Sequence, residues 1–237
     1  MQRLLANGKL DPTFGIDGVT LLAESASYFL QINGLHLFKD NSLLVAASVN
    51  DFSAQLIANF IYRLDPQGKL DPKFGQNGSI RIGDEIYDVF VDDQSATLVD
   101  FLNATTGEHA VTRFLLRGQK DPDYLAQIPQ IHGVTQVNVA LTQDNQLAFC
   151  IRNNYQTLTL FKSNQHGRVD AGFGGSGVVN VPFQYTNRPI LHAEREHLVL
   201  AAYVHTAATD GLDLVFFRYH LDGSPDKNFA ENGMFRA

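Results

Sequence analysis

Three ionisable side chains are the first candidates for binding or chemistry: Asp88, Arg188 and His192. Each lies in or beside a short apolar segment, where a charged side chain is uncommon. A carboxylate, a guanidinium and an imidazole can bind a polar ligand or move protons. We therefore take these three as candidate binding residues. The alternative is that they are solvated side chains without a specific role.

A glycine-rich motif occurs at residues 172–177, which fit the pattern G-x-G-x-x-G. Dinucleotide binding by this pattern needs a helix after the glycines, because the pyrophosphate lies at the helix N-terminus. Residues 178–181 are instead typical of a strand. The motif therefore predicts a turn, and we expect no cofactor.

Other motifs give no assembled metal or catalytic site. The densest histidines are His192, His197 and His205. His192 and His197 are five residues apart on adjacent strand segments and do not obviously converge, because strand residues an odd number apart point to opposite faces. H-E-x-x-H, cysteine-pair and G-x-S-x-G motifs are absent. The single cysteine, Cys150, lies in an apolar strand pattern and is expected to be a buried, inert thiol. We therefore predict no metal and no catalytic residues.

One segment, residues 8–18, recurs four more times in degraded form, at intervals of about 50 to 60 residues. Each copy has a glycine, an aspartate three residues later and an aromatic residue three further on, and usually a second glycine. The glycines suit a positive φ, the aspartate can fix a turn through backbone N–H groups, and the aromatic can anchor the turn in apolar surface. These structural repeat turns contain Gly8, Asp11, Phe14, Gly18, Gly68, Asp71, Phe74, Gly78, Gly118, Asp121, Tyr124, Gly167, Asp170, Phe173, Gly177, Gly223, Asp226, Phe229 and Gly233.

A cation lies five residues before the first glycine of every repeat turn. A cation and an aspartate that flank the same turn predict a structural ion pair, or bonds from the cation to backbone carbonyls. The calcium alternative is weak, because each turn repeats about one carboxylate and calcium takes roughly six to eight oxygens. The five cations are Arg3, Arg63, Arg113, Lys162 and Arg218.

The run R-x-x-x-x-G-x-L-D-x-x-F-G-x-x-G resembles the delta-60 repeat, a family of bacterial β-propeller repeats without an established activity. The resemblance spans nearly the whole chain and is most specific in the first two copies. It is weaker in copy five and in copy three, where Ile128 replaces the second glycine, and copy four has Lys162 in place of arginine. The resemblance implies a propeller and transfers no catalytic residues.

Between the repeat turns, each unit has a mixed strand, a polar turn, a continuously apolar strand and a strand that ends near the cation. This pattern of short strands in units of about 50 residues is typical of propeller blades. The predicted fold class is all-β, a β-propeller of four to five blades, each a four-stranded antiparallel sheet. The predicted strands are 28–38, 42–49, 55–64, 79–82, 86–91, 96–102, 110–116, 128–131, 136–142, 146–152, 157–162, 178–182, 189–193, 197–205, 212–220 and a short strand from 234.

The repeat predicts a single β-propeller domain over residues 1–237. Residues 1–24 form a half-blade with closing strands, and the blades follow at 25–84, 85–133, 134–183 and 184–237. The first strand of each blade lines the central channel of a propeller. Alignment on the polar turns places Leu35, Asp88, Val139 and Ile190 in one tier of this lining, in which Asp88 is the charged member.

Composition restricts the function classes. A net charge of −7 with scattered Lys and Arg argues against nucleic-acid binding, and no apolar run approaches the roughly 20 residues that span a bilayer. The apolar run at residues 4–6 is too short for a signal-peptide core, so the sequence assigns no compartment: the default is the cytoplasm, and the alternative is an extracellular protein if the N-terminus is incomplete.

The leading hypothesis is therefore a non-catalytic β-propeller that presents a face or channel to a partner protein or a glycan. We expect a monomer, with a strand-sharing oligomer as the alternative. The rival hypothesis is a hydrolase or lyase that acts on a glycan-like substrate in the channel through Asp88 and its neighbours.

Overall fold

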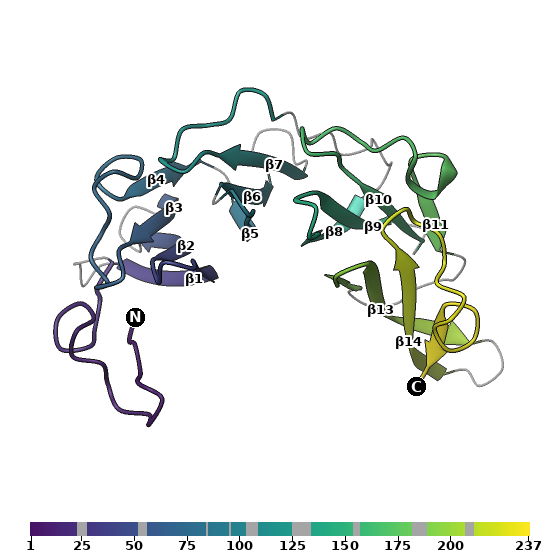
Figure 1. Cartoon of the computed structure of the whole chain (residues 1–237), viewed down its shortest axis with the longest axis horizontal. Coiled ribbons are helices and arrows are strands. Elements are labelled where there is room, and N and C mark those ends of the chain that lie inside the picture. The colour runs from purple at the N-terminus through teal and green to yellow at the C-terminus, as the bar shows by residue number, and fades with distance from the viewer. Residues whose placement is uncertain are drawn as a thin grey trace. The chain divides into compact units, whose positions relative to one another are not determined.

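The computed structural model is built of antiparallel strands and describes residues 1–22, 28–51, 56–83, 85–94, 96–102, 109–124, 134–153, 157–181, 189–206 and 211–237 (Figure 1). In these ranges the only helical element is a single 3₁₀ turn, η1 (Phe173–Gly175). No helix within them is long and apolar enough to cross a membrane. The chain separates into two compact units, Met1–Pro122 and Asp123–Ala237, which are described in turn. The single domain expected from the sequence stays a prediction.

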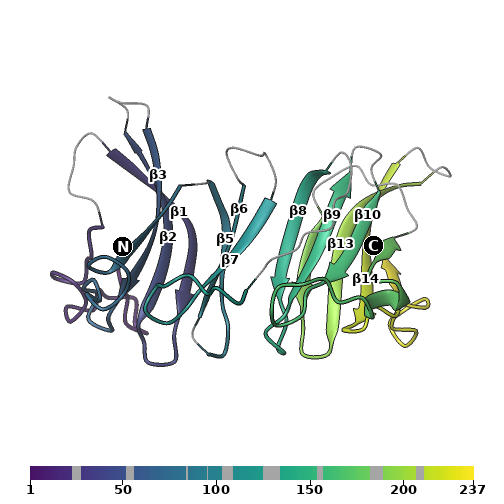
Figure 2. The same ribbon diagram turned by 90° about the horizontal axis from the view of Figure 1, so that it is seen from above.

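The first unit contains a four-stranded sheet with the order β1-β2-β3-β4 and a three-stranded sheet with the order β5-β6-β7 (Figure 2). The fourth strand expected for the second of these sheets, at 128–131, lies outside the described residues. The strands are β1 (Tyr28–Leu37), β2 (Leu43–Asp51), β3 (Leu56–Leu64), β4 (Ser79–Ile82), β5 (Glu85–Val91), β6 (Thr97–Leu102) and β7 (His109–Phe114).

The second unit contains two four-stranded sheets, with the orders β11-β10-β9-β8 and β12-β13-β14-β15. All four-stranded sheets are antiparallel, so this part of the sequence prediction is confirmed, and the strand bounds agree to within a few residues. The strands are β8 (Val134–Leu141), β9 (Leu147–Asn153), β10 (Leu158–Lys162), β11 (Val179–Val181), β12 (Ile190–Ala193), β13 (His197–Thr206), β14 (Gly211–His220) and β15 (Met234–Arg236).

The second strand of a sheet is continuously apolar because it is covered on both faces. Successive residues 44–47 of β2 are fully buried, and residues 147–151 of β9 are almost fully buried. Successive strand residues point to opposite faces, so burial of every residue requires packing on both sides. Cys150 lies in β9, and burial raises the pKa of its thiol, as expected for an inert structural cysteine.

Neighbouring sheets of the first unit pack through a close approach of β1 to β5. A Cβ placed on Gly34 would lie 2.6 Å from a methyl group of Val89, so only glycine fits between the two strands. One residue earlier, the Asn33 amide donates to the carbonyl oxygen of Ile86 and to the Ser48 hydroxyl. A polar bridge and an apolar contact therefore fix how the first two sheets of this unit meet.

Each repeat turn is tied to its preceding strand by backbone hydrogen bonds. In all five, the aspartate N–H donates to the carbonyl oxygen of the cation eight residues earlier, for example Asp71 to Arg63 at 2.8 Å and Asp226 to Arg218 at 3.0 Å. Every repeat-turn glycine identified in the sequence has a positive φ. The repeated sequence thus produces the same backbone path each time.

Consecutive repeat turns also bond to one another. The glycine after the aromatic residue donates its N–H to the carbonyl just before the next repeat turn: Gly15 to Gln67 at 2.6 Å and Gly75 to Arg117 at 2.9 Å in the first unit, and Gly174 to Asp222 at 2.7 Å in the second. The aromatic residue beside the donor is buried in these three turns. Those aromatics are Phe14, Phe74 and Phe173.

Two glycine substitutions separate backbone strain from packing at these turns. A Cβ on Gly75 would lie 2.1–2.9 Å from atoms of Ser79 and Ile80, with the Ser79 carbonyl oxygen nearest, whereas a Cβ on Gly8 would meet nothing within 4 Å. Both residues have positive φ. We expect Gly8→Ala to lower the free energy of unfolding by about 1 kcal/mol through strain alone, and Gly75→Ala by about 3 kcal/mol or more. Urea denaturation of both variants measures this, and equal losses would contradict it.

Candidate functional site

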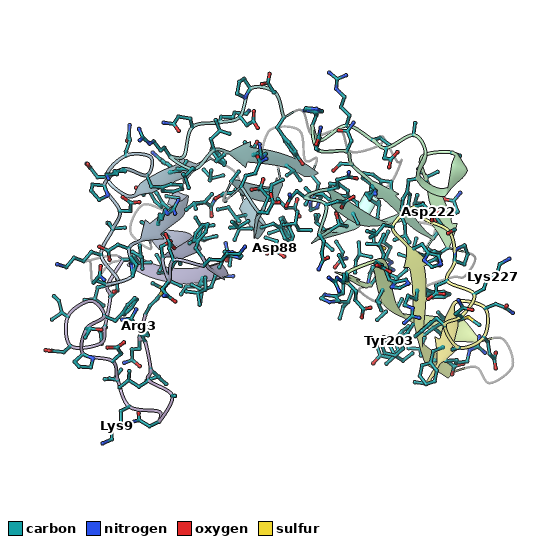
Figure 3. All side chains as sticks on the ribbon, viewed as in Figure 1. Arg3, Lys9, Asp88, Tyr203, Asp222 and Lys227 are labelled. Carbon is teal, nitrogen blue, oxygen red and sulfur yellow. The ribbon has the colours of Figure 1, made fainter. Side chains whose placement is uncertain are left out.

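The structure places two of the three residues expected to bind a ligand. Asp88 lies on β5 in the first unit and is exposed (Figure 3). His192 lies on β12 in the second unit and is also exposed. Arg188 lies outside the described residues. Asp88 therefore has to be judged by its neighbours in the first unit.

The tier expected for Asp88 is wrong by one residue. The β1–β2 hairpin closes with Phe38 N–H donating to Ser42, and the β5–β6 hairpin closes with Asp92 N–H donating to Ala96. Phe38 therefore corresponds to Asp92 rather than to Val91. Asp88, four residues before Asp92, then corresponds to Gly34 of β1.

This shift follows from how the hairpin is capped. The Asp92 carboxylate accepts the N–H groups of Gln94 and Ala96, so the turn is fixed from Asp92 rather than from Asp93. The residue level with Leu35 is consequently the buried Val89. Asp88 occupies the opposite face of its strand from Val89.

An acidic cluster surrounds Asp88. Asp88 on β5 is the cross-strand partner of Asp100 on β6, next to a β-bulge at Tyr87. Asp100 is only 3% exposed, and its Oδ1 lies 3.5 Å from Nδ1 of His109. The His109 ring lies 5.0 Å from the Tyr87 ring. Two carboxyl groups, an imidazole and a phenol thus meet on three adjacent strands.

The environment shifts both carboxyl groups in the same direction. Partial desolvation by the surrounding strands raises the pKa of Asp88, although the residue still reaches solvent. The nearby Asp100 carboxylate raises this pKa further, while a hydrogen bond from the Val89 N–H opposes the shift. Burial also raises the pKa of Asp100, against the opposing effect of His109. Carboxyl groups shifted this way can hold a proton nearer to neutral pH and release it, as general acids do.

Sequence reasoning missed Asp100. Its signal was a lone aspartate inside a strand that is otherwise apolar or neutral, Thr97–Leu102. Burial of that strand on both faces forces the carboxyl group away from water, which a motif search does not detect.

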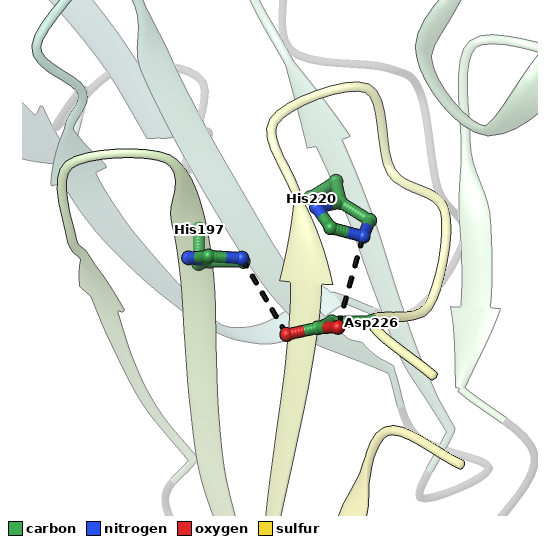
Figure 4. A group of neighbouring side chains, drawn as sticks. All are labelled: His197, His220 and Asp226. Carbon is green, nitrogen blue, oxygen red and sulfur yellow. Dashed lines mark ion pairs between the residues drawn. The ribbon is translucent and has the colours of Figure 1, made fainter. Parts of the chain in front are cut away.

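A second cluster lies at the last repeat turn (Figure 4). The register of β13 and β14 pairs His197 with His220, and their rings are 5.1 Å apart. The repeat-turn carboxylate of Asp226 lies 3.5 Å from Nε2 of His197 through Oδ2, and 3.8 Å from Nε2 of His220 through Oδ1. Three ligating groups distant in sequence therefore converge, which the spacing of His192, His197 and His205 does not indicate.

The Asp226 carboxylate is also held by Arg218 and Asn228. The Arg218 Nε donates to Oδ2 at 2.7 Å, Nη2 lies 2.7 Å from the same oxygen, and the Asn228 N–H donates to Oδ1 at 3.0 Å. Burial by itself would raise the pKa of Asp226, but the bonds from Asn228 and Arg218 outweigh it and lower the pKa. The carboxylate is therefore ionised and fixed in orientation.

The cation is differently surrounded at other repeat turns. Arg113 lies between its own Asp121 at 2.7 Å and the hairpin residue Asp92 at 2.6 Å. Lys162 likewise lies between a repeat-turn carboxylate and a hairpin carboxylate. At the last repeat turn the hairpin contributes an imidazole, His197, where those two turns receive a carboxylate.

The glycine-rich motif at 172–177 forms the fourth repeat turn. It folds into η1 and continues into β11 rather than into the helix that dinucleotide binding requires. A shallow cavity of about 510 Å³ lies between this turn and residues 222–225 of the next turn. Packing explains Gly174, on which a Cβ would lie 2.5 Å from Val179, whereas Gly175 and Gly177 are explained by their positive φ.

No family model and no curated protein matches the chain. Among solved structures, it is similar to the β-propeller domain of the Trilobed protease from Pyrococcus furiosus, described as having an open velcro topology. The TM-score is 0.53 at 7% identity, over 91% of this chain and 58% of that one, so this chain spans a little over half the length of its neighbour. At this identity the likeness concerns the fold alone. The chain is an all-β protein with propeller-type antiparallel sheets.

The buried carboxyl group of Asp100 predicts a pH-dependent stability. Because its pKa is raised in the folded state, the folded chain binds more protons above pH 3.8 and loses stability as the pH rises through the folded-state pKa. Asn does not titrate, so Asp100→Asn should be stabilised relative to wild type on the order of 1 kcal/mol at pH 7.5, and by less near pH 4. Urea unfolding at both pH values measures this, with the exposed Asp17→Asn as the control. A pH-independent difference would contradict it.

Proposed function

We propose that the protein is a non-catalytic β-propeller repeat protein of the delta-60 type, with four to five blades, that acts as a binding scaffold for a partner protein. The likeness to a β-propeller domain supports the architecture. The five repeat turns and their common backbone support repeats of one kind. The segment 1–22 carries a complete repeat turn of its own, which supports a partial blade before the first full sheet.

The observation that carries the binding proposal is an exposed apolar face on β1. Ile32, Leu35 and Leu37 are 48%, 60% and 61% exposed. A β-bulge between Ile32 and Gly34 puts Ile32 on the same face as the two leucines. We call these three residues the β1 face. Apolar side chains gathered in this way are typical of interaction surfaces.

The chemistry of the β1 face favours a protein over a glycan. Its three side chains are aliphatic, whereas sugars are commonly bound by aromatic rings and hydrogen-bonding groups. Leu35 is the cross-strand partner of Val45, which is fully buried in the cluster around Phe14. The β1 face is therefore continuous with a closely packed core, which keeps its side chains well ordered for contact with a partner.

The double variant Leu35→Thr/Leu37→Thr tests this proposal. Threonine keeps strand propensity and removes the apolar surface. We expect wild type to capture a defined partner from extracts of the source organism, and the double variant to lose it without a change in melting temperature. Leu116→Thr, which replaces a leucine that is 50% exposed elsewhere in the same unit, is the control and should retain the partner. Capture of the same protein by the double variant would contradict the proposal, and a clearly lower melting temperature would show that the face packs within the folded chain.

A second candidate function is a hydrolase or lyase that acts on a glycan-like substrate. The observation that favours it is the Asp88–Asp100 pair, in which burial raises both pKa values and the Asp100 charge raises that of Asp88 further. Glycoside hydrolysis uses two carboxyl groups, of which one is protonated as the general acid. Asp100 next to His109 would be the buried acid, and the exposed Asp88 would face the substrate.

Wild type and the variants Asp88→Asn and Asp100→Asn, assayed on a panel of glycosides and polysaccharides, distinguish the two functions. The enzyme hypothesis predicts turnover that falls by about 100-fold or more in either variant and is unchanged in Asp17→Asn. Turnover no higher in wild type than in Asp88→Asn would exclude this pair as the catalytic site.

A further inference from the structure

The last repeat turn gathers three groups that can ligate a metal. One nitrogen each from His197 and His220 and a carboxylate oxygen from Asp226 all lie within 4.8 Å of one another. We propose that these three side chains bind a divalent transition metal of the zinc type, with two imidazole nitrogens and one carboxylate oxygen as ligands. This site lies in the second unit and is independent of the β1 face.

The distances suit such an ion. Zinc binds imidazole nitrogen at about 2.0–2.1 Å and carboxylate oxygen at about 2.0–2.2 Å, so tetrahedral ligand atoms lie about 3.3–3.5 Å from each other. The two separations from the carboxylate involve different oxygens, 3.5 Å from Oδ2 to Nε2 of His197 and 3.8 Å from Oδ1 to Nε2 of His220, and each is close to this value. The His220 side chain is 44% exposed, so a small rotation about its side-chain bonds can bring its nitrogen into range.

The donor set suits a borderline transition metal. Asp226 also pairs with Arg218, whose Nε donates a short hydrogen bond to it. A neutral imidazole offers a nitrogen lone pair, and imidazole suits zinc, copper and nickel.

Arg218 and Asn228 hold the carboxylate in the way that outer-shell partners hold metal ligands. They fix its orientation, with Arg218 on Oδ2 and the Asn228 N–H on Oδ1. The positive charge of Arg218 also repels a cation, so we expect an affinity weaker than that of four-ligand structural zinc sites. With three protein ligands and two histidines that are partly exposed, solvent can complete the coordination.

The contrast with other repeat turns argues for a role beyond the structural ion pair. At turn three the cation has two carboxylates, Asp92 and Asp121, and at turn four Lys162 also lies between two carboxylates. At these two turns carboxylates alone are sufficient to pair with the cation. At turn five two imidazoles surround one carboxylate, and such a donor set is better suited to a borderline transition metal than to an arginine.

Metal binding would link three segments of the second unit. His197 begins β13, His220 ends β14, and Asp226 belongs to the repeat turn that leads to β15. An ion bound by all three would stabilise the folded state, because the unfolded chain does not hold these ligands together.

Untagged full-length protein, stripped with EDTA and dialysed, provides the test. We expect calorimetric titration with ZnCl₂ at pH 7.5 to give one site per chain, and CoCl₂ to give visible absorption bands typical of low-coordinate, nitrogen-ligated Co²⁺. Zinc should also raise the melting temperature. His197→Ala and His220→Ala should each weaken zinc binding by about tenfold or more and abolish this rise.

His166→Ala is the matched control, because it removes an exposed histidine of the same unit outside the cluster. This variant should bind zinc as wild type does. Absence of saturable zinc binding in wild type would overturn the proposal, as would full zinc binding in the folded double variant His197→Ala/His220→Ala. If a cluster variant does not fold, the wild-type cobalt spectrum decides: a spectrum of fully hydrated Co²⁺ overturns the site.

Discussion

The structure depends on one repeated interaction, the hydrogen bond from a glycine N–H of one repeat turn to the backbone carbonyl before the next. Gly15, Gly75 and Gly174 make it, each beside a buried phenylalanine. Because it joins backbone to backbone, it places few demands on the side chains between the turns. The positive φ and the close approach of the chain that follows in the same repeat explain why glycine stands there: a Cβ on Gly75 would clash with the Ser79 carbonyl. Within each unit, successive sheets are therefore set beside one another in the same way.

The cation of each repeat turn is where the copies differ. Its backbone always accepts the aspartate N–H, but its side chain has different partners. Arg3 reaches the carbonyl of Pro66, Arg113 binds two carboxylates, and Arg218 shares Asp226 with two histidines. A constant backbone with variable side-chain partners lets one turn become a specialised site while the others remain structural. The histidine cluster of the last turn fits this pattern.

Burial explains the other specialised site. The second strand of a sheet is covered on both faces, so a carboxyl group placed in it loses water. Asp100 is such a residue, and its position opposite Asp88 and near His109 gives the exposed Asp88 an acidic neighbour with a raised pKa. The same sheet geometry leaves β1, an edge strand of its sheet, with an exposed apolar face. The β1 face and the Asp88–Asp100 pair therefore have the same origin: inner strands of a sheet are covered on both faces, and edge strands on one.

The sequence by itself determined the strands, the antiparallel sheets and the repeat turns, because period-two patterning, glycine with positive φ and the aspartate turn are local properties. It did not determine register or convergence. Alignment on the polar turns assigned Asp88 to the tier of Leu35, which Val89 occupies, because the Asp92 carboxylate caps the β5–β6 hairpin. Asp100 and Asp88, like His197 and His220, are brought together only by strand pairing. Pairing joins residues distant in the chain, and a local pattern holds no record of which distant residue will lie opposite.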